Sequence, residues 1–180
     1  MLLTLLSCSG FAVGKETPRA DLILSPLQYH LRYSKEANTE INWQGYYGFG
    51  VGGQWQRHIL MIDYLQSSTS SGNSTLAFKK DRAEWMISYK YNILALNSFL
   101  NLQAGLGFGF YNDKLQSRLG AQVINEESGA QNSMLALVGL GGHWKFLFYA
   151  AEIQAISGKD FDPQPTLGGL FRIGLQFAIF

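Results

Sequence analysis

The sequence predicts an all-β protein: an eight-stranded antiparallel up-and-down transmembrane β-barrel with four long outer loops and three short turns. Three observations lead to this class. Charged residues gather in a few polar windows, the segments between the windows alternate apolar and polar residues with period two, and the connections alternate in length. Strict alternation over about eight residues is typical of a β-strand, because successive side chains point to opposite faces.

The composition excludes several classes of protein. Charged residues make up 15% of the 180-residue chain, against about 25% in a typical soluble domain. A hydrophobic share of 47% argues against intrinsic disorder, and a net charge of +1 argues against a dedicated nucleic-acid binder. The single Cys excludes an internal disulfide. No zinc or calcium ligand spacing occurs, so we expect no metal and no cofactor.

Eight segments carry the period-two alternation. We expect strands over 27–33, 41–51, 58–66, 85–91, 100–110, 134–144, 147–155 and 169–179. The polar windows 35–40, 67–84, 112–131 and 157–166 hold most of the charges and follow the first, third, fifth and seventh strands. Short links follow the second, fourth and sixth. Long loops at one end and short turns at the other describe an up-and-down barrel, and eight tilted strands are enough to cross a bilayer.

The two faces of these strands differ in a way that favours lipid outside. One face carries long aliphatic and aromatic side chains, and the other is rich in Gly, Gln, Asn and Ser. A soluble barrel, the alternative, would need a charged exterior, and the polar face has too few charges for that. In water the apolar face would be one large adhesive patch, whereas closure in lipid satisfies every backbone group. Aromatic residues near segment ends are expected at the membrane interfaces: Trp43, Trp55, Trp85, Tyr91, Trp144 and Tyr149.

With this strand rhythm and the ending Leu170-Phe-Arg-Ile-Gly-Leu-Gln-Phe-Ala-Ile-Phe180, residues 22–180 resemble the small eight-stranded outer-membrane barrels of the OmpA/OmpX type from Gram-negative bacteria. The resemblance implies a monomer in the bacterial outer membrane. Its partners would be outer-membrane lipid, lipopolysaccharide and the assembly machinery, which reads a terminal Phe. Phe180 lies one step out of phase with the preceding apolar residues, so either a bulge corrects the phase or the signal is imperfect.

The first fourteen residues differ from the rest of the chain. Residues 1–14 are a short apolar stretch followed by Lys15, which resembles the core and cleavage region of a secretion leader. A basic segment in front of it is lacking, as it would be if the true start lay further upstream. The alternatives are an unprocessed N-terminus and lipidation at Cys8 after a loose lipobox, Leu5-Leu6-Ser7.

Polar residues on the inward face form the candidate site. We expect an internal ion-pair network centred on Glu152 and Arg172, because a charge inside a narrow barrel is costly unless it is paired. The other expected members are His30, Arg32, Asp63 and Lys90. Such a network would plug the barrel and fix its register. The alternative is a narrow, gated ion path.

The expected function is non-catalytic: a structural or surface-interaction role through the outer loops. The alternatives are a narrow pore with a charged interior and a lipid A-modifying membrane enzyme. The known lipid A deacylase barrels use a His-x-Ser pair, and no His in this sequence is followed two residues later by Ser. An acyl-transfer set of His30, Asp63 and Ser67 has no motif behind it, so no catalytic residue is predicted. Apolar residues of the longest loop, Leu115, Leu119, Val123 and Ile124, are expected to pack over the barrel mouth, with a partner contact as the alternative.

Overall fold

The computed structural model describes residues 20–34, 42–72, 76–159, 161 and 164–179. These residues form nine β-strands, and none of them belongs to a helix that could span a membrane. The strands are β1 (Ala20–Ser34), β2 (Asn42–Trp55), β3 (His58–Gly72), β4 (Leu76–Ala95), β5 (Asn101–Leu119), β6 (Gln122–Glu127), β7 (Gln131–Trp144), β8 (Leu147–Gly158) and β9 (Thr166–Ala178).

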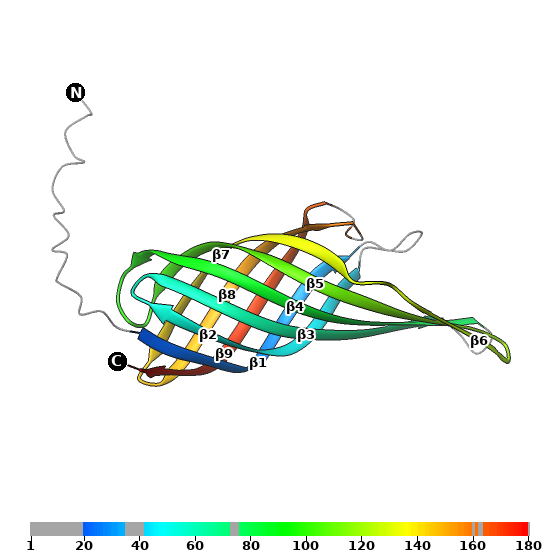
Figure 1. Ribbon diagram of the computed structural model, residues 1–180, viewed down its shortest axis with the longest axis horizontal. Coiled ribbons are helices and arrows are strands. Elements are labelled where there is room, and N and C mark those ends of the chain that lie inside the picture. The colour runs from blue at the N-terminus through cyan, green and yellow to red at the C-terminus, as the bar shows by residue number, and fades with distance from the viewer. Residues whose placement is uncertain (1–19, 35–41, 73–75, 160, 162–163, 180) are drawn as a thin grey trace, which may run out of the picture.

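Eight of the strands close into a barrel (Figure 1). Hydrogen-bonded neighbours follow the order β4-β3-β2-β1-β9-β8-β7-β5, and a further pairing between β4 and β5 closes the ring. Every pairing is antiparallel, and consecutive strands are neighbours apart from the insertion of β6. The predicted eight-stranded up-and-down barrel is therefore confirmed, and β6 is a short addition that pairs with β5.

Three short connections gather at one end of the barrel, here called the turn end. They are residues 56–57, 96–100 and 145–146, and the described parts of both termini lie at the same end (Figure 1). Gln56 and Lys145 have φ values of 55° and 56°, which place them in the left-handed region. That conformation lets the chain reverse within two residues. The opposite end is called the loop end.

The strands are longer at the loop end than the sequence predicts. Windows 67–84 and 112–131, expected as loops, continue as paired strands of β3, β4, β5 and β6. Together 67–72, 76–82, 113–119 and 122–127 form the protruding sheet, a tapering extension beyond the barrel wall (Figure 1). Both faces of such an extension can meet water, so the apolar alternation that identifies a half-buried strand is lost while backbone pairing continues.

A β-bulge sets which residues of β1 face inward. The register of β1 shifts between Ser25 and Gln28 against β2 and between Leu24 and Leu27 against β9. Pro26 lies in this bulge, where its missing N–H costs no ladder hydrogen bond. Ser25 faces inward before the shift, and Gln28 and His30 face inward after it. Without the bulge, strict alternation from Ser25 would point the polar side chains Gln28 and His30 outward.

The barrel interior is filled with side chains in layers. An apolar layer near the turn end comprises Ile23, Ile59, Met61, Phe148 and Ala150. A larger apolar cluster toward the loop end includes Leu65, Met86, Leu135, Ile156 and Leu170. On β3 the buried Asp63 lies between Met61 and Leu65, so charged residues occupy the level between the two apolar layers.

Candidate functional site: the charged interior and the protruding sheet

The centre of the barrel holds four charged side chains in mutual contact. Arg172 donates from Nη1 to Asp63 at 3.0 and 3.3 Å and from Nη2 to Glu152 at 3.4 Å. Lys90 Nζ donates to Glu152, and Gln28 Nε2 donates to Asp63 at 2.8 Å. All four charged residues are at most 3% exposed. Two cations and two carboxylates leave the cluster formally neutral, which is the condition for burying charge.

Glycine makes the room that this cluster occupies. A Cβ at Gly50 would come within 2.1 Å of Asp63 Oδ1 and 2.2 Å of Gln28 Nε2. A Cβ at Gly139 would meet the Cα of Glu152 at 2.8 Å and its Cγ at 2.9 Å. The inward glycines of β2 and β7 therefore give the long charged side chains of the other strands the space to cross the barrel.

His30 and Arg32 belong to a second cluster closer to the loop end. Arg32 pairs with Glu84 at 2.5 Å, and its guanidinium lies 4.4 Å from the ring centroid of Tyr46. The Nδ1 of His30 is 3.2 Å from Arg32 Nη2. The six residues predicted as one network thus fall into two contact groups. Sequence reasoning missed Glu84, because it lies in a window expected to be a loop.

A third ion pair joins the barrel to the protruding sheet. Arg82 donates from Nε and Nη2 to the two carboxylate oxygens of Asp113, each at 2.6 Å, and Lys80 lies 3.3 Å from the same carboxylate. The Arg82 guanidinium also lies 4.2 Å from the Tyr111 ring centroid. Burial would raise the pKa of Asp113, but the hydrogen bonds and charge of Arg82, with Lys80, outweigh it and hold the pKa below its ordinary value.

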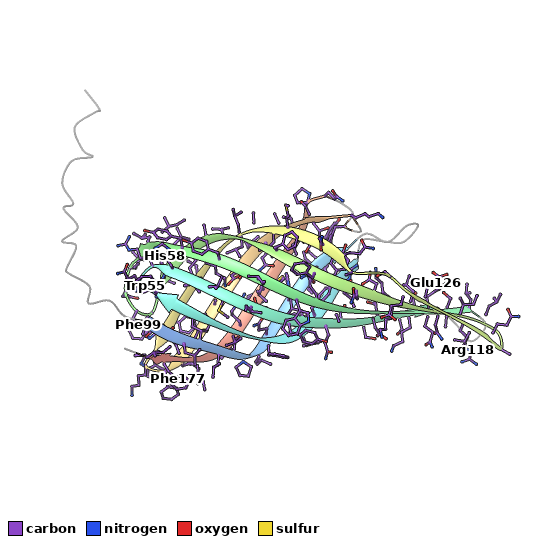
Figure 2. All side chains as sticks on the ribbon, viewed as in Figure 1. Trp55, His58, Phe99, Arg118, Glu126 and Phe177 are labelled. Carbon is purple, nitrogen blue, oxygen red and sulfur yellow. The ribbon has the colours of Figure 1, made fainter. Side chains whose placement is uncertain are left out.

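The predicted interface aromatics lie on the outer face. Trp43, Trp55, Trp85, Tyr91 and Trp144 are 38–61% exposed, and the half-buried Tyr149 donates its hydroxyl to the carbonyl oxygen of Phe99. Trp43 and Trp55 are at opposite ends of β2. The twelve residue steps between them span about 40 Å, or about 30 Å along the barrel axis at the usual strand tilt, which matches a bilayer. Figure 2 shows Trp55, His58, Phe99 and Phe177 at the turn end.

The histidines do not assemble a hydrolase site with the residues considered from the sequence. His30 contacts Arg32, Asp63 is bound by Gln28 and Arg172, and Ser67 accepts a hydrogen bond from Gln44. His58 faces outward and is hydrogen-bonded to the Tyr89 hydroxyl at 2.6 Å. Among the described residues there is also no group of three or more potential metal ligands.

The protruding sheet has one face with a group of apolar side chains. In register, Phe78 is beside Ser117 and Ser117 beside Ile124, while Leu76 is beside Leu119. These apolar side chains and Leu115 are 41–59% exposed. The expectation that the apolar residues of 112–131 pack over the barrel mouth is therefore wrong, because strand pairing carries Leu115, Leu119, Val123 and Ile124 away from the mouth.

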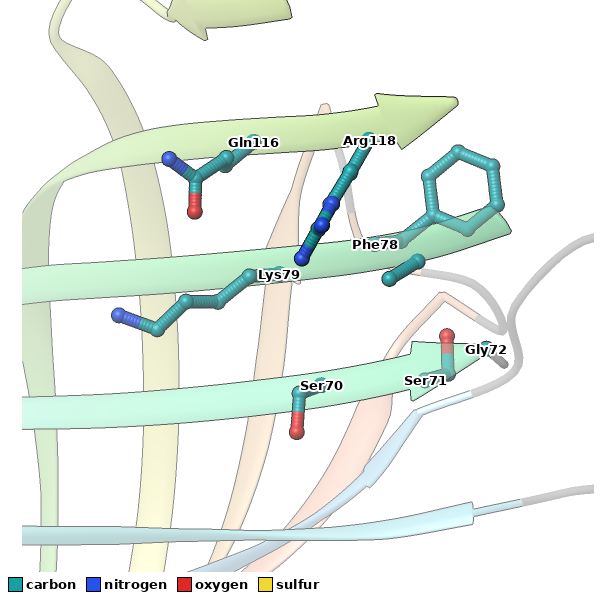
Figure 3. Close-up of a pocket in the computed structure, with 8 residues that line it drawn as sticks. Ser70, Ser71, Gly72, Phe78, Lys79, Gln116 and Arg118 are labelled. Atoms are coloured by element: carbon teal, nitrogen blue, oxygen red, sulfur yellow. The ribbon is translucent and has the colours of Figure 1, made fainter. Parts of the chain in front are cut away.

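The end of the protruding sheet contains a shallow cavity of about 370 Å³ (Figure 3). Its lining includes Ser70, Ser71, Lys79, Gln116 and Arg118, from three adjacent strands. Lys79 is paired with Asp81 at 2.8 Å, and Arg118 donates from Nε to the carbonyl oxygen of Gly120 at 3.1 Å. The cavity thus combines two cations with the hydroxyl of Ser70, which is opposite Lys79 in the strand pairing.

A closed eight-stranded antiparallel barrel with an apolar exterior, aromatic ends and a packed interior has the fold of the small outer-membrane β-barrels. No protein-family profile and no curated protein matches the sequence. One similar solved structure is Ail, the attachment invasion locus protein of Yersinia pestis, with a TM-score of 0.57 and 14% identity over 88% of this chain and 99% of that one. Another is the N-terminal β-barrel domain of Pseudomonas aeruginosa OprF, with a TM-score of 0.57 and 10% identity over 89% of this chain and 100% of that one. Neisserial surface protein A is also similar, with a TM-score of 0.55 and 11% identity over 88% of this chain and 95% of that one. At these identities the likeness is one of fold.

Two predicted features lie outside the described residues: the leader over 1–14 and the terminal Phe180. The described part of the C-terminus ends with β9 at Ala178 and with Ile179, whose N–H donates to the Ala20 carbonyl oxygen at 2.7 Å.

Proposed function

We propose that this protein is a non-catalytic integral protein of the Gram-negative outer membrane that acts at the cell surface through its protruding sheet. The observation that carries the proposal is the sheet itself. It extends β3, β4 and β5 beyond the barrel and exposes both an apolar face and a basic end cavity. Exposed apolar patches on soluble surfaces are typical of interaction sites.

The topology supports an orientation with the turn end in the periplasm. Short turns on the periplasmic side and longer segments outside are the rule for barrels of this kind. The apolar girdle would then contact outer-membrane phospholipid and lipopolysaccharide, and the assembly machinery would read the C-terminal sequence with its terminal Phe180.

The chemistry of the end cavity favours an anionic ligand. Lys79 and Arg118 supply positive charge, and Ser70, which is opposite Lys79 in the strand pairing, supplies a hydroxyl donor. Sulfate and phosphate groups bind best where such charged donors converge. Ail has been solved in complex with the heparin analogue sucrose octasulfate. By this chemistry, a sulfated or phosphorylated surface glycan is the ligand class proposed for this chain.

A first experiment tests location and orientation. Outer-membrane fractions run on gels with and without boiling should show a band that shifts on boiling, as a closed membrane barrel requires. Protease added to intact cells should cleave within 67–84 or 112–131. A soluble band that does not shift, or cleavage only after cell lysis, would contradict the proposal.

A second experiment tests the anionic ligand. The purified full chain in micelles should be retained on heparin at low salt, and Lys79→Gln combined with Arg118→Gln should elute at clearly lower salt, because screened charge contacts give this binding. Lys114→Gln is the matched control. Lys114 is also on the protruding sheet and, like Lys79, is paired with a carboxylate, that of Glu127, but it lies outside the cavity lining. An equal shift in the control would show only non-specific charge binding.

The pore alternative gains no support from the interior. Side chains of Asp63, Lys90, Glu152 and Arg172 are 0–1% exposed and are held between the two apolar layers. A conducting path would require these layers to open, so conduction is not part of the proposed function.

A further inference from the structure

The turn-end mouth of the barrel contains a polar cavity of about 460 Å³. Its walls come from five strands and two connections, and the lining residues include Asp21, Gln54, Arg57, Asn92, Asn101 and His143. The next inward residue of β1 is Ile23, and the first buried residue of β3 is Ile59; both belong to the apolar layer at this end. Because this buried apolar layer lies between the cavity and the charged centre, the cavity is a polar-walled vestibule separate from that centre.

Asn92 is the residue most clearly directed into this vestibule. It is 3% exposed, and its Oδ1 has no hydrogen-bond partner among the described residues. The pairing of β4 with β5 shifts register between Asn92 and Leu94, while Ile93 and Leu94 are both exposed outside. Such a bulge re-aims a side chain. The backbone N–H of Asn92 donates to the Arg57 carbonyl oxygen at 2.8 Å, which fixes its position against the turn.

The other walls supply both acceptors and donors. His143 Nδ1 lies 3.2 Å from the Lys145 carbonyl oxygen, which can only accept a hydrogen bond. In the neutral ring this contact places the proton on Nδ1 and leaves Nε2 as an acceptor. Asp21 accepts from Gln176 Nε2 at 2.7 Å and is a carboxylate with further acceptor capacity. Arg57 supplies donors on the same wall as Asn92.

We infer that the vestibule binds an uncharged saccharide of one or two rings. A sugar hydroxyl can both donate and accept a hydrogen bond. Sugar hydroxyls can therefore donate to Asn92 Oδ1 and His143 Nε2, and they can accept from the Arg57 guanidinium. The volume lies within the range of small-molecule sites. Asp21 and Arg57 offset each other in charge, so the site favours no net ionic ligand. This inference is independent of the protruding sheet and of its ligand.

The test uses the full chain folded in micelles and N,N′-diacetylchitobiose, an uncharged disaccharide, as the probe. The side-chain amide NMR signals of Asn92 should shift saturably at millimolar concentration. Asn92→Ala should weaken binding by about three- to tenfold, the effect of one lost hydrogen bond. Asn125→Ala on β6 is the matched control and should bind like the parent, because Asn125 is exposed and bonded to Gln116.

Three outcomes would overturn the inference: no saturable shift at tens of millimolar, unchanged binding by a folded Asn92→Ala variant, or tighter binding of zwitterionic alanyl-alanine than of the disaccharide. The gel shift on boiling reports whether each variant is folded. If Asn92→Ala does not fold, Arg57→Gln in the exposed turn takes its place, with the same expected weakening.

Discussion

Replacing Arg172 by Met should unfold the barrel at much lower urea concentration. The substitution keeps a long apolar stem and removes the guanidinium that bridges Asp63 and Glu152. Lys90 alone would then face two carboxylates, all of them buried. One uncompensated negative charge would remain in the centre of the barrel.

The expected size follows from that imbalance. Removing one partner of a buried ion pair costs about 3–5 kcal/mol, because the other charge stays desolvated and unpaired. With a urea dependence of about 2 kcal/mol per molar, this cost lowers the unfolding midpoint by about 1.5–2.5 M. The midpoint can be measured on the chain folded into lipid vesicles, by tryptophan fluorescence and by the gel shift in parallel.

A double variant separates charge from packing. Asp63→Asn combined with Arg172→Met leaves Lys90 and Glu152 as a neutral pair, and the introduced amide oxygen can still accept from Gln28 Nε2, as Asp63 does now. The double variant should recover at least half of the lost stability. If it is no more stable than Arg172→Met alone, charge imbalance is not the cause and the reasoning is refuted.

Three further predictions concern packing, pH and conduction. Gly50→Ala should cost about 1–3 kcal/mol through overpacking against Asp63, whereas Gly53→Ala, whose added Cβ would meet nothing closer than 3.6 Å, should be near neutral in the same urea assay. Folding lowers the pKa of Asp113 below its ordinary value of 3.8. The ion pair of Asp113 with Arg82 therefore stabilises the base of the protruding sheet fully above about pH 4, and this stabilisation is lost as the pH falls through the folded pKa. The protection of β6 amides against hydrogen exchange, relative to the intrinsic rate at each pH, should therefore fall below about pH 4, and Asp113→Asn should abolish this step. In planar bilayers the parent protein should be silent, and steady single-channel currents would show that the interior layers open.

The fold could be predicted from the sequence because each membrane-crossing strand has lipid on one side and a narrow interior on the other. Leu60, Ile62 and Tyr64 alternate with Met61 and Asp63, and that contrast appears directly in the residue pattern. The turns were also predictable, because charges and short links fall where the alternation breaks.

The protruding sheet could not be found in this way. Its residues meet water on both faces, so Thr69, Lys80 and Glu126 show no contrast that would identify a strand. The partners of the interior charges were equally hidden. Arg32 pairs with Glu84 across the barrel. Which residues of different strands meet at one level depends on the stagger between the strands, and the apolar alternation within a single strand carries no information on that stagger. A salt-bridge partner for Arg32 could have been sought in the polar windows, since a buried guanidinium needs a carboxylate.

The continuity of β3, β4 and β5 from the barrel into the protruding sheet has a consequence for the energetics of recognition. No linker separates the sheet from its membrane anchor, so the sheet inherits the barrel's fixed orientation. From Trp85 to Leu76 the strand β4 runs about 30 Å, which sets how far the end cavity stands above the lipid. A ligand that reaches this height meets a surface already ordered. Association then costs little backbone conformational entropy, unlike binding by a flexible loop of the same composition.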